Sequence, residues 1–109
     1  MMMEPGVASS LRHWHTQQDE FLVILEGELV LITDEGETTM RAGEMAGFAK
    51  GDQNGHCLVN RSKSRAIFLV VGNRSDDDEC FYSEVDMRAK SVAQGGGYVS
   101  RDGVPYDSP

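Results

Sequence analysis

The sequence predicts an all-β domain, and three observations support that fold class. Short runs of β-forming residues between Leu11 and Val71 are broken by glycine or acidic residues at roughly 8–12-residue intervals, a spacing typical of a β-sandwich or β-barrel. The same stretch shows no helical periodicity. The chain has 109 residues, the length of one domain, so we expect a single domain over residues 1–109.

The first two expected strands are separated by a very short turn. Residues 20–25 and 28–33 are rich in apolar and β-branched side chains, and Glu26–Gly27 lies between them. A two-residue connection of this kind is typical of a β-hairpin. We therefore expect these two strands to pair with each other.

Further strands follow along the chain. A second turn at residues 34–37 leads into an expected strand at 38–41, and residues 65–71 form a long apolar strand that ends at Gly72. Between them, residues 42–55 carry four glycines and few β-branched side chains. This composition favours bends and short strands over one continuous element.

The composition changes after Gly72. The acidic run at residues 76–79 suits a solvated loop, because neighbouring carboxylates repel one another. Three glycines at 95–97 suit a flexible joint, and they open a C-terminal tail over residues 95–109. Between Tyr98 and Tyr106 this tail carries enough apolar side chains to dock on the rest of the domain.

Charge and composition exclude several partners. The formal net charge is −8 and no stripe of lysine and arginine offsets it, so binding to nucleic acid is not expected. The longest apolar run, Phe21–Leu25, is far below the roughly 20 residues of a membrane helix, and the N-terminus does not resemble a signal peptide. We expect no membrane contact, and a cytoplasmic protein in which Cys57 and Cys80 are buried, reduced thiols.

Four side chains have the types and spacing of a metal site. His13 and His15 lie two apart, so on a strand both rings project from the same face. Glu20 follows after a short turn, and His56 would come from a distant strand. Three neutral imidazoles and one carboxylate suit Mn, Fe, Co, Ni or Zn, and they leave one or two coordination positions open. A His-x-His pair alone could equally be structural, but the chain has three histidines and all three fall in the pattern.

This pattern resembles the first motif of the cupin superfamily, Gly-x5-His-x-His-x(3,4)-Glu-x6-Gly. The match runs from His13 to Gly27. Its leading glycine is displaced, since Val7 stands at the expected place and Gly6 comes one residue early.

Residues 43–60 resemble the second cupin motif, Gly-x5-Pro-x-Gly-x2-His-x3-Asn. The matching positions are Gly43, Gly51, His56 and Asn60. Ala49 replaces the proline, and four residues rather than two separate Gly51 from His56. A two-residue insertion carrying Asn54 restores the match, whereas counting without an insertion places Asn54 itself at the metal.

The resemblance implies a double-stranded β-helix, the jelly-roll barrel of cupins, holding one divalent transition metal. The ligands it implies are His13, His15, Glu20 and His56, with Asn54 as the alternative to His56. In similar small bacterial single-domain cupins, one or more strands usually precede the first motif, and here twelve residues precede His13. We therefore expect a barrel short of an N-terminal strand, a gap that a partner subunit or the C-terminal tail could fill, and a homodimer.

Two classes of function follow from the resemblance. The first is a metal-dependent enzyme, such as an isomerase or oxygenase, acting on a small molecule inside the barrel. The second is a non-catalytic module that binds or senses a small ligand in the same pocket. A phosphosugar isomerase has little support, because no cluster of Lys or Arg occupies inward-facing positions near the motifs to bind phosphate. No serine or cysteine nucleophile has a histidine to spare as its base.

Overall fold

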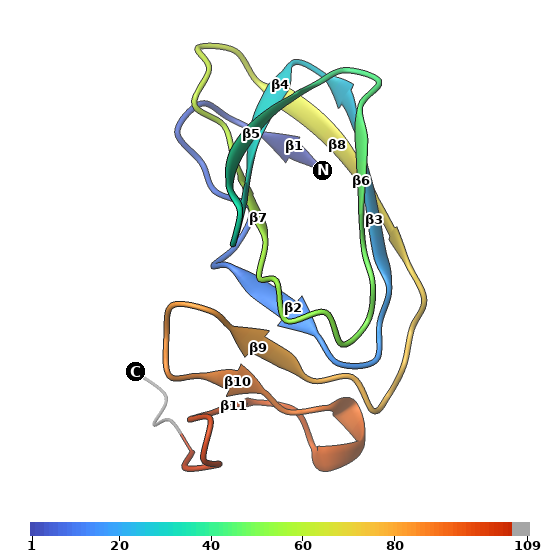
Figure 1. The fold of residues 1–109 in the computed structure, drawn as a ribbon, viewed down its shortest axis with the longest axis vertical. Coiled ribbons are helices and arrows are strands. Elements are labelled where there is room, and N and C mark those ends of the chain that lie inside the picture. Colours follow the sequence, from blue (N-terminus) through green and yellow to red (C-terminus); the bar gives the residue numbers. More distant parts are fainter. Residues whose placement is uncertain (106–109) are drawn as a thin grey trace.

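A computed structural model describes residues 1–105 and confirms the all-β fold (Figure 1). The described residues form eleven strands and one short 3-10 turn, η1 (Val92–Gln94). The strands are β1 (Met2–Met3), β2 (His13–His15), β3 (Glu20–Glu26), β4 (Glu28–Thr33), β5 (Gly36–Arg41), β6 (Met45–Phe48), β7 (Cys57–Val59), β8 (Ala66–Gly72), β9 (Cys80–Tyr82), β10 (Arg88–Ala89) and β11 (Tyr98–Val99). Within residues 1–105, no helix has the length and apolar character needed to cross a membrane.

The strands form three antiparallel sheets. One has the order β1-β8-β3-β6 and another the order β5-β4-β7, and these two surround the apolar interior. The third sheet, β11-β10-β9-β2, lies across one end of the other two (Figure 1). The His-x-His strand belongs to this end sheet, because β2 pairs with β9 from His13↔Tyr82 to His15↔Cys80.

The prediction of a hairpin at Glu26–Gly27 is wrong. β3 pairs with β6 and β8, whereas β4 pairs with β5 and β7, so the chain crosses from one sheet to the other at Gly27. Gly27 has a φ of +76°, and a Cβ there would lie 2.8 Å from the carbonyl oxygen of Arg65. A short glycine turn is compatible with a corner between sheets as well as with a hairpin, so the local pattern does not distinguish the two.

The other expected elements up to Gly72 are confirmed. β4 and β5 pair through to Thr33↔Gly36 around a tight turn, although β5 begins two residues earlier than expected. The glycine-rich stretch contains one short strand, β6, between bends. The long apolar strand is β8, which pairs with β3 along most of its length.

The interior is built by alternation along the strands. In β3, Leu22 and Ile24 are 2% and 1% exposed, whereas Phe21 and Leu25 point outward and are 41% and 56% exposed. Burial of one such aliphatic side chain contributes about 1.5–3 kcal/mol, so this alternation fixes which face of β3 points inward. The buried cluster consists of Met3, Leu22, Ile24, Leu29, Met40, Leu58, Ala66 and Phe68.

The N-terminal residues supply a short strand at the sheet edge where a strand was expected to be missing. β1 pairs with β8 through Met2↔Ile67 and Met3↔Ala66, and Met3 is buried. β1 covers just the first part of β8, and beyond Phe68 no strand within residues 1–105 pairs with that edge. The described part of the C-terminal tail, residues 95–105, does not fill it, because β11 pairs with β10 in the end sheet.

The chain after Gly72 forms strands that its composition did not predict. Asp76 and Asp77 are exposed, as expected of a solvated loop, but Asp78 and Glu79 are half-buried. The prediction of a solvated loop was wrong for Asp78 and Glu79, because each carboxylate has a partner. Asp78 bonds to the His15 ring, and Glu79 pairs with the guanidinium of Arg88 in β10. The tail docks through β11, whereas its last four residues, 106–109, lie outside the described residues.

Candidate metal centre

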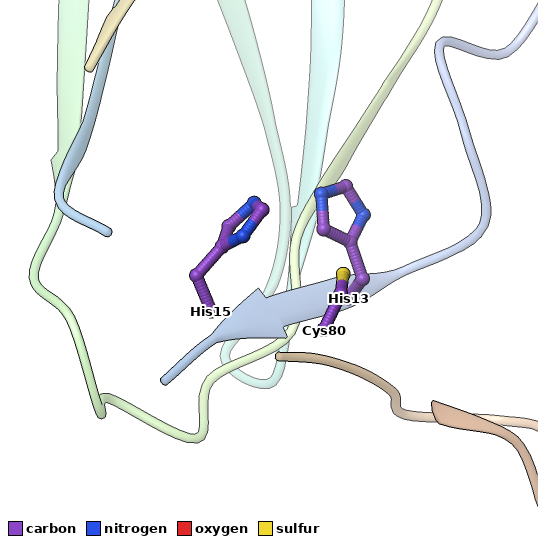
Figure 2. Close-up of side chains that lie close together, drawn as sticks. All are labelled: His13, His15 and Cys80. Atoms are coloured by element: carbon purple, nitrogen blue, oxygen red, sulfur yellow. The ribbon is translucent and has the colours of Figure 1, made fainter. Parts of the chain in front are cut away.

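The structure brings the four predicted ligand residues together where the end sheet meets the barrel. His13 and His15 come from β2, Glu20 opens β3, and His56 immediately precedes β7. The backbones of His13 and His56 exchange two hydrogen bonds of 3.2 and 2.9 Å. The ring centre of His13 lies 5.1 Å from those of both His15 and His56. The rings of His13 and His15 project from the same side of β2, as their spacing predicted (Figure 2).

Asn54, the alternative to His56, lies outside this cluster. Its side-chain amide donates to the Glu35 carboxylate, and its side-chain carbonyl accepts from the Asp34 amide, both at 2.7 Å. These bonds tie Asn54 to the β4–β5 turn. His56 is instead 3% exposed and lies 3.0 Å from Glu20, so the alignment with a two-residue insertion is the one that the geometry favours.

Glu20 is the shared anion of the cluster. One of its oxygens lies 3.2 Å from Nε2 of His15 and the other 3.0 Å from Nε2 of His56. The hydrogen bond from His15, followed by that from His56, holds the pKa of Glu20 well below its ordinary value. The bond to Glu20 in turn raises the pKa of His15, whereas burial lowers the pKa of His13. Glu20 is therefore a carboxylate at neutral pH, and His13 resists protonation.

Hydrogen bonds to Nδ1 orient two of the imidazole rings. Nδ1 of His13 lies 2.8 Å from the carbonyl oxygen of Leu11, and Nδ1 of His15 lies 2.8 Å from the Asp78 carboxylate. These acceptors favour a proton on Nδ1 of both rings, which directs Nε2 toward the centre. Nε2 of His15 also donates a proton to Glu20, and a bound cation would take the place of that proton. The ring of His56 is held differently, by stacking on Phe48 at 3.6 Å, and its buried Nδ1 has no hydrogen-bond partner among residues 1–105.

The donor atoms of three of the four residues come near the spacing of a shared ion, and their chemistry suits one. One donor atom each from His13, Glu20 and His56 lies within 4.8 Å of the other two. Two donors bonded to one ion are at most about 4.2 Å apart, twice a metal–nitrogen bond of about 2.1 Å. The cluster is close to that limit, and imidazole nitrogens with one carboxylate suit a first-row transition metal.

Asp78 is a site residue that the sequence reasoning missed. Its side chain is 10% exposed, and besides His15 it accepts hydrogen bonds from the backbone amides of Gln17 (2.8 Å) and Gln18 (3.1 Å). Asp78 thus holds both a ring of the cluster and the turn that leads from His15 to Glu20. No signal in the sequence indicated this contact, since 63 positions separate the two partners.

Cys80 also lies at the candidate metal centre, although the sequence predicted only a buried, reduced thiol at this position. It pairs across strands with His15, and its sulfur lies within 4.8 Å of a ring nitrogen of both His13 and His15. Figure 2 shows the sulfur on the same side of β2 as the two rings. Burial raises the pKa of the Cys80 thiol to about 12, and the Asp78 carboxylate adds to that shift.

A cavity of about 330 Å³ adjoins the cluster. His13, Glu20 and His56 line part of it, and the remaining wall is mainly apolar, with Leu22, Leu58, Phe68 and Val70 among its side chains. No lysine or arginine of the described residues lines this cavity.

The final residue of the second motif is structural. Asn60 is fully buried, and its amide nitrogen donates 2.9 Å hydrogen bonds to the carbonyl oxygens of Met3 and Ser64. Its carbonyl oxygen accepts from both the amide and the hydroxyl of Ser62. Asn60 therefore fastens the N-terminal strand and the β7–β8 loop to the barrel that carries the cluster.

The solved structures most useful for comparison share this fold. A sugar phosphate isomerase of the cupin superfamily from Silicibacter pomeroyi is 47% identical, with a TM-score of 0.93 over 98% of this chain and 68% of that one. A protein from Acidithiobacillus ferrooxidans is 22% identical, with a TM-score of 0.86 over 99% of this chain and 69% of its own, and shows the fold alone. A predicted oxalate decarboxylase from Thermotoga maritima is 25% identical, with a TM-score of 0.59 over 66% of this chain and 60% of its own.

Family assignment rests on the sequence match together with these structures. A search of curated proteins found no match. The model of the cupin domain matches residues 1–72, which include both histidine-bearing motifs and end with β8. The chain therefore belongs to the cupin family.

Proposed function

We propose that this cupin binds one divalent transition metal through His13, His15, Glu20 and His56, and holds a small polar molecule beside it. The observation that carries the proposal is that His15 and His56 both bond to the half-buried Glu20 carboxylate beside a cavity, with a donor atom of His13 within 4.8 Å of Glu20 and His56. When bound, such an ion would supply a Lewis acid that polarises an oxygen of the small molecule.

The chain's own residues would prepare the centre for that role. Leu11 and Asp78 keep the protons of two rings on Nδ1, and Glu20 offsets part of the charge of a divalent ion. The apolar wall of the cavity lowers the local dielectric constant, which strengthens polar contacts made to a ligand inside it. Isomerisation, oxygenation and binding without turnover are all compatible with this arrangement.

The cavity supports an oxygen-rich molecule without phosphate better than a sugar phosphate. Buried phosphate groups are bound by arginine or lysine, and the described residues bring neither into the cavity wall. The similar Silicibacter pomeroyi protein is named as a sugar phosphate isomerase, and its 47% identity makes that activity the second candidate. A non-catalytic ligand-binding module is the alternative to both enzymes.

Metal content tests the centre directly. Protein purified without added metal or an affinity tag, then loaded with Mn, Fe, Co, Ni or Zn in turn, should hold about one ion per chain by elemental analysis. We expect His56→Ala to lose the ion, and Asn54→Ala to keep it because Asn54 bonds to the β4–β5 turn. Retention by the first variant with loss from the second would reverse the ligand assignment.

Matched ligands test the substrate class. Metal-loaded protein would be offered aldoses, ketoses and small hydroxy acids, each sugar with and without its phosphate, while turnover and dioxygen uptake are followed. We expect the compounds without phosphate to bind, and His15→Ala to abolish any turnover. Tight binding with no turnover for any metal would favour the binding module, and a requirement for phosphate would favour the sugar phosphate isomerase.

We also propose that the chain forms a homodimer through the β1-β8-β3-β6 sheet. The edge of β8 beyond Phe68 is unpaired within residues 1–105, and unpaired edges invite pairing with another strand. The outer face of the same sheet exposes a cluster of apolar side chains, of the kind that marks an interface. Its members are Phe21, Leu25, Met45, Leu69 and Val71.

A further inference from the structure

Cys80 faces the space that the histidines of β2 enclose. In the antiparallel β2–β9 pair Cys80 lies directly opposite His15, and Tyr82 lies opposite His13. Side chains of directly opposed residues project from the same face of a sheet. The sulfur accordingly lies beside the two rings in Figure 2. Its position thus follows from strand register.

We infer that the Cys80 sulfur is a further donor to the metal centre, and that the centre therefore favours thiophilic ions such as zinc and cobalt over manganese. This inference rests on the proposed function. It adds a ligand from outside residues 1–72, the part of the chain that matches the cupin domain.

The donor atoms form two triads that share His13. One triad is His13, Glu20 and His56, and the other is His13, His15 and Cys80, with all donor atoms of each within 4.8 Å of one another. A zinc ion bonded to one sulfur and one imidazole nitrogen holds them at most about 4.4 Å apart, the sum of bonds of about 2.3 and 2.1 Å.

The surroundings of the sulfur suit a ligand. Cys57 and Cys80 are both free thiols, so Cys80 is not committed to a disulfide. Coordination would replace the thiol proton, which passes to solvent, with no change of oxidation state.

A sulfur donor changes which ions the centre prefers. Thiolate ligands favour zinc and other soft or borderline ions, whereas manganese prefers oxygen donors. The triad with Glu20 offers one oxygen and two nitrogens, and the triad with Cys80 offers one sulfur and two nitrogens. Cys80 would therefore strengthen binding of zinc or cobalt more than binding of manganese.

Cobalt(II) spectroscopy tests the sulfur donor. The full chain is titrated with cobalt(II), and we expect a thiolate-to-cobalt charge-transfer band in the near ultraviolet at one ion per chain. Cys80→Ser should lose the band, and the matched control Cys57→Ser should keep it. X-ray absorption of the zinc-loaded wild-type chain gives a measurement that needs no variant, with a sulfur shell expected at about 2.3 Å.

The outcomes separate this inference from the proposed function. Cobalt or zinc binding without a charge-transfer band and without a sulfur shell would overturn the role of Cys80 and leave the histidine–glutamate centre standing. A band that survives Cys80→Ser but disappears in Cys57→Ser would also overturn it. Failure to bind any transition metal would refute the proposed centre itself.

Discussion

Replacing Asp78 by asparagine should weaken metal binding without a change in the ligands themselves. The Asp78 carboxylate accepts three hydrogen bonds, from the ring of His15 and from the amides of Gln17 and Gln18. An asparagine has one acceptor oxygen and one donor nitrogen in place of the two carboxylate oxygens. If its oxygen faces the two amides, its nitrogen faces His15 and requires an acceptor there. Nδ1 of His15 then loses its proton, and the ring keeps the proton that Nε2 donates to Glu20.

The size of this effect follows from the contacts. The Asp78 side chain is 10% exposed, so solvent screens its bond to His15 only weakly. A hydrogen bond to a charged group contributes about 1.5–3 kcal/mol. Loss of a partner that orients a ligating histidine weakens metal binding by about 10–100-fold, which is about 1.4–2.7 kcal/mol. The two estimates agree, so we expect a loss in that range.

Titration calorimetry with zinc at fixed pH measures the loss. Asp77→Asn is the matched control, because it removes the same charge from the neighbouring exposed position. Nitrogen NMR of the metal-free protein gives a second readout, since His15 of the wild type should carry protons on both ring nitrogens, bonded to Asp78 and Glu20, whereas His15 of the variant should carry one on Nε2 alone. Unchanged affinity in Asp78→Asn, or a proton that stays on Nδ1 of His15 in that variant, would refute the orienting role.

Three further variants test the fold and the assembly. Asn60→Ala should lower the free energy of unfolding by about 2–5 kcal/mol in urea titrations, because it removes the four hydrogen bonds of a fully buried side chain, including the one to the buried Met3 carbonyl; a loss within experimental error would contradict this. Gly27→Ala should destabilise the protein by about 1–3 kcal/mol more than Gly43→Ala, since both have positive φ but only the former has backbone atoms within 4 Å of the new Cβ; equal losses would argue against the corner geometry. Light scattering should give twice the 12.0 kDa of one chain, and Phe21→Lys should reduce it to one chain; a wild-type monomer would end the dimer proposal.

Local patterns predicted the strands well, and their pairing less well. The alternation of buried and exposed side chains in β3 and the turn before β5 could be read from neighbouring residues. The corner at Gly27 could not, because a strand that changes sheets and a strand that reverses direction can share the same run of apolar residues around one glycine. The difference lies in Arg65 and Ala66, whose backbone approaches Gly27 from far along the chain.

Strand parity and motif spacing predicted that the four ligand residues cluster. They did not predict the residues that surround and orient these ligands. His13 and His15 share a face because they lie two apart on a strand, and His56 reaches them through a backbone bridge to His13. Asp78 and Cys80 carried no such signal. Their acidic and thiol side chains became part of the site through the register of β9 on β2, which depends on pairing between residues more than 60 positions apart.

Because β9 pairs with β2, the segment after Gly72 has a role in the candidate metal centre. β2 has three residues. It pairs with β9, and it also makes the bridge from His13 to His56 and a 2.8 Å hydrogen bond from the Gly51 amide to the His15 carbonyl. Two of the four predicted ligands, His13 and His15, therefore lie on a strand that pairs mainly with β9, which is outside residues 1–72, the part of the chain that matches the cupin domain. A short strand with one paired edge orients its side chains poorly, because backbone entropy opposes the ordering of each residue. Pairing with β9, the Asp78 bonds to His15 and the following turn, and the stacking of Trp14 on Phe81 at 4.8 Å together hold β2 in the register that points both imidazoles at Glu20.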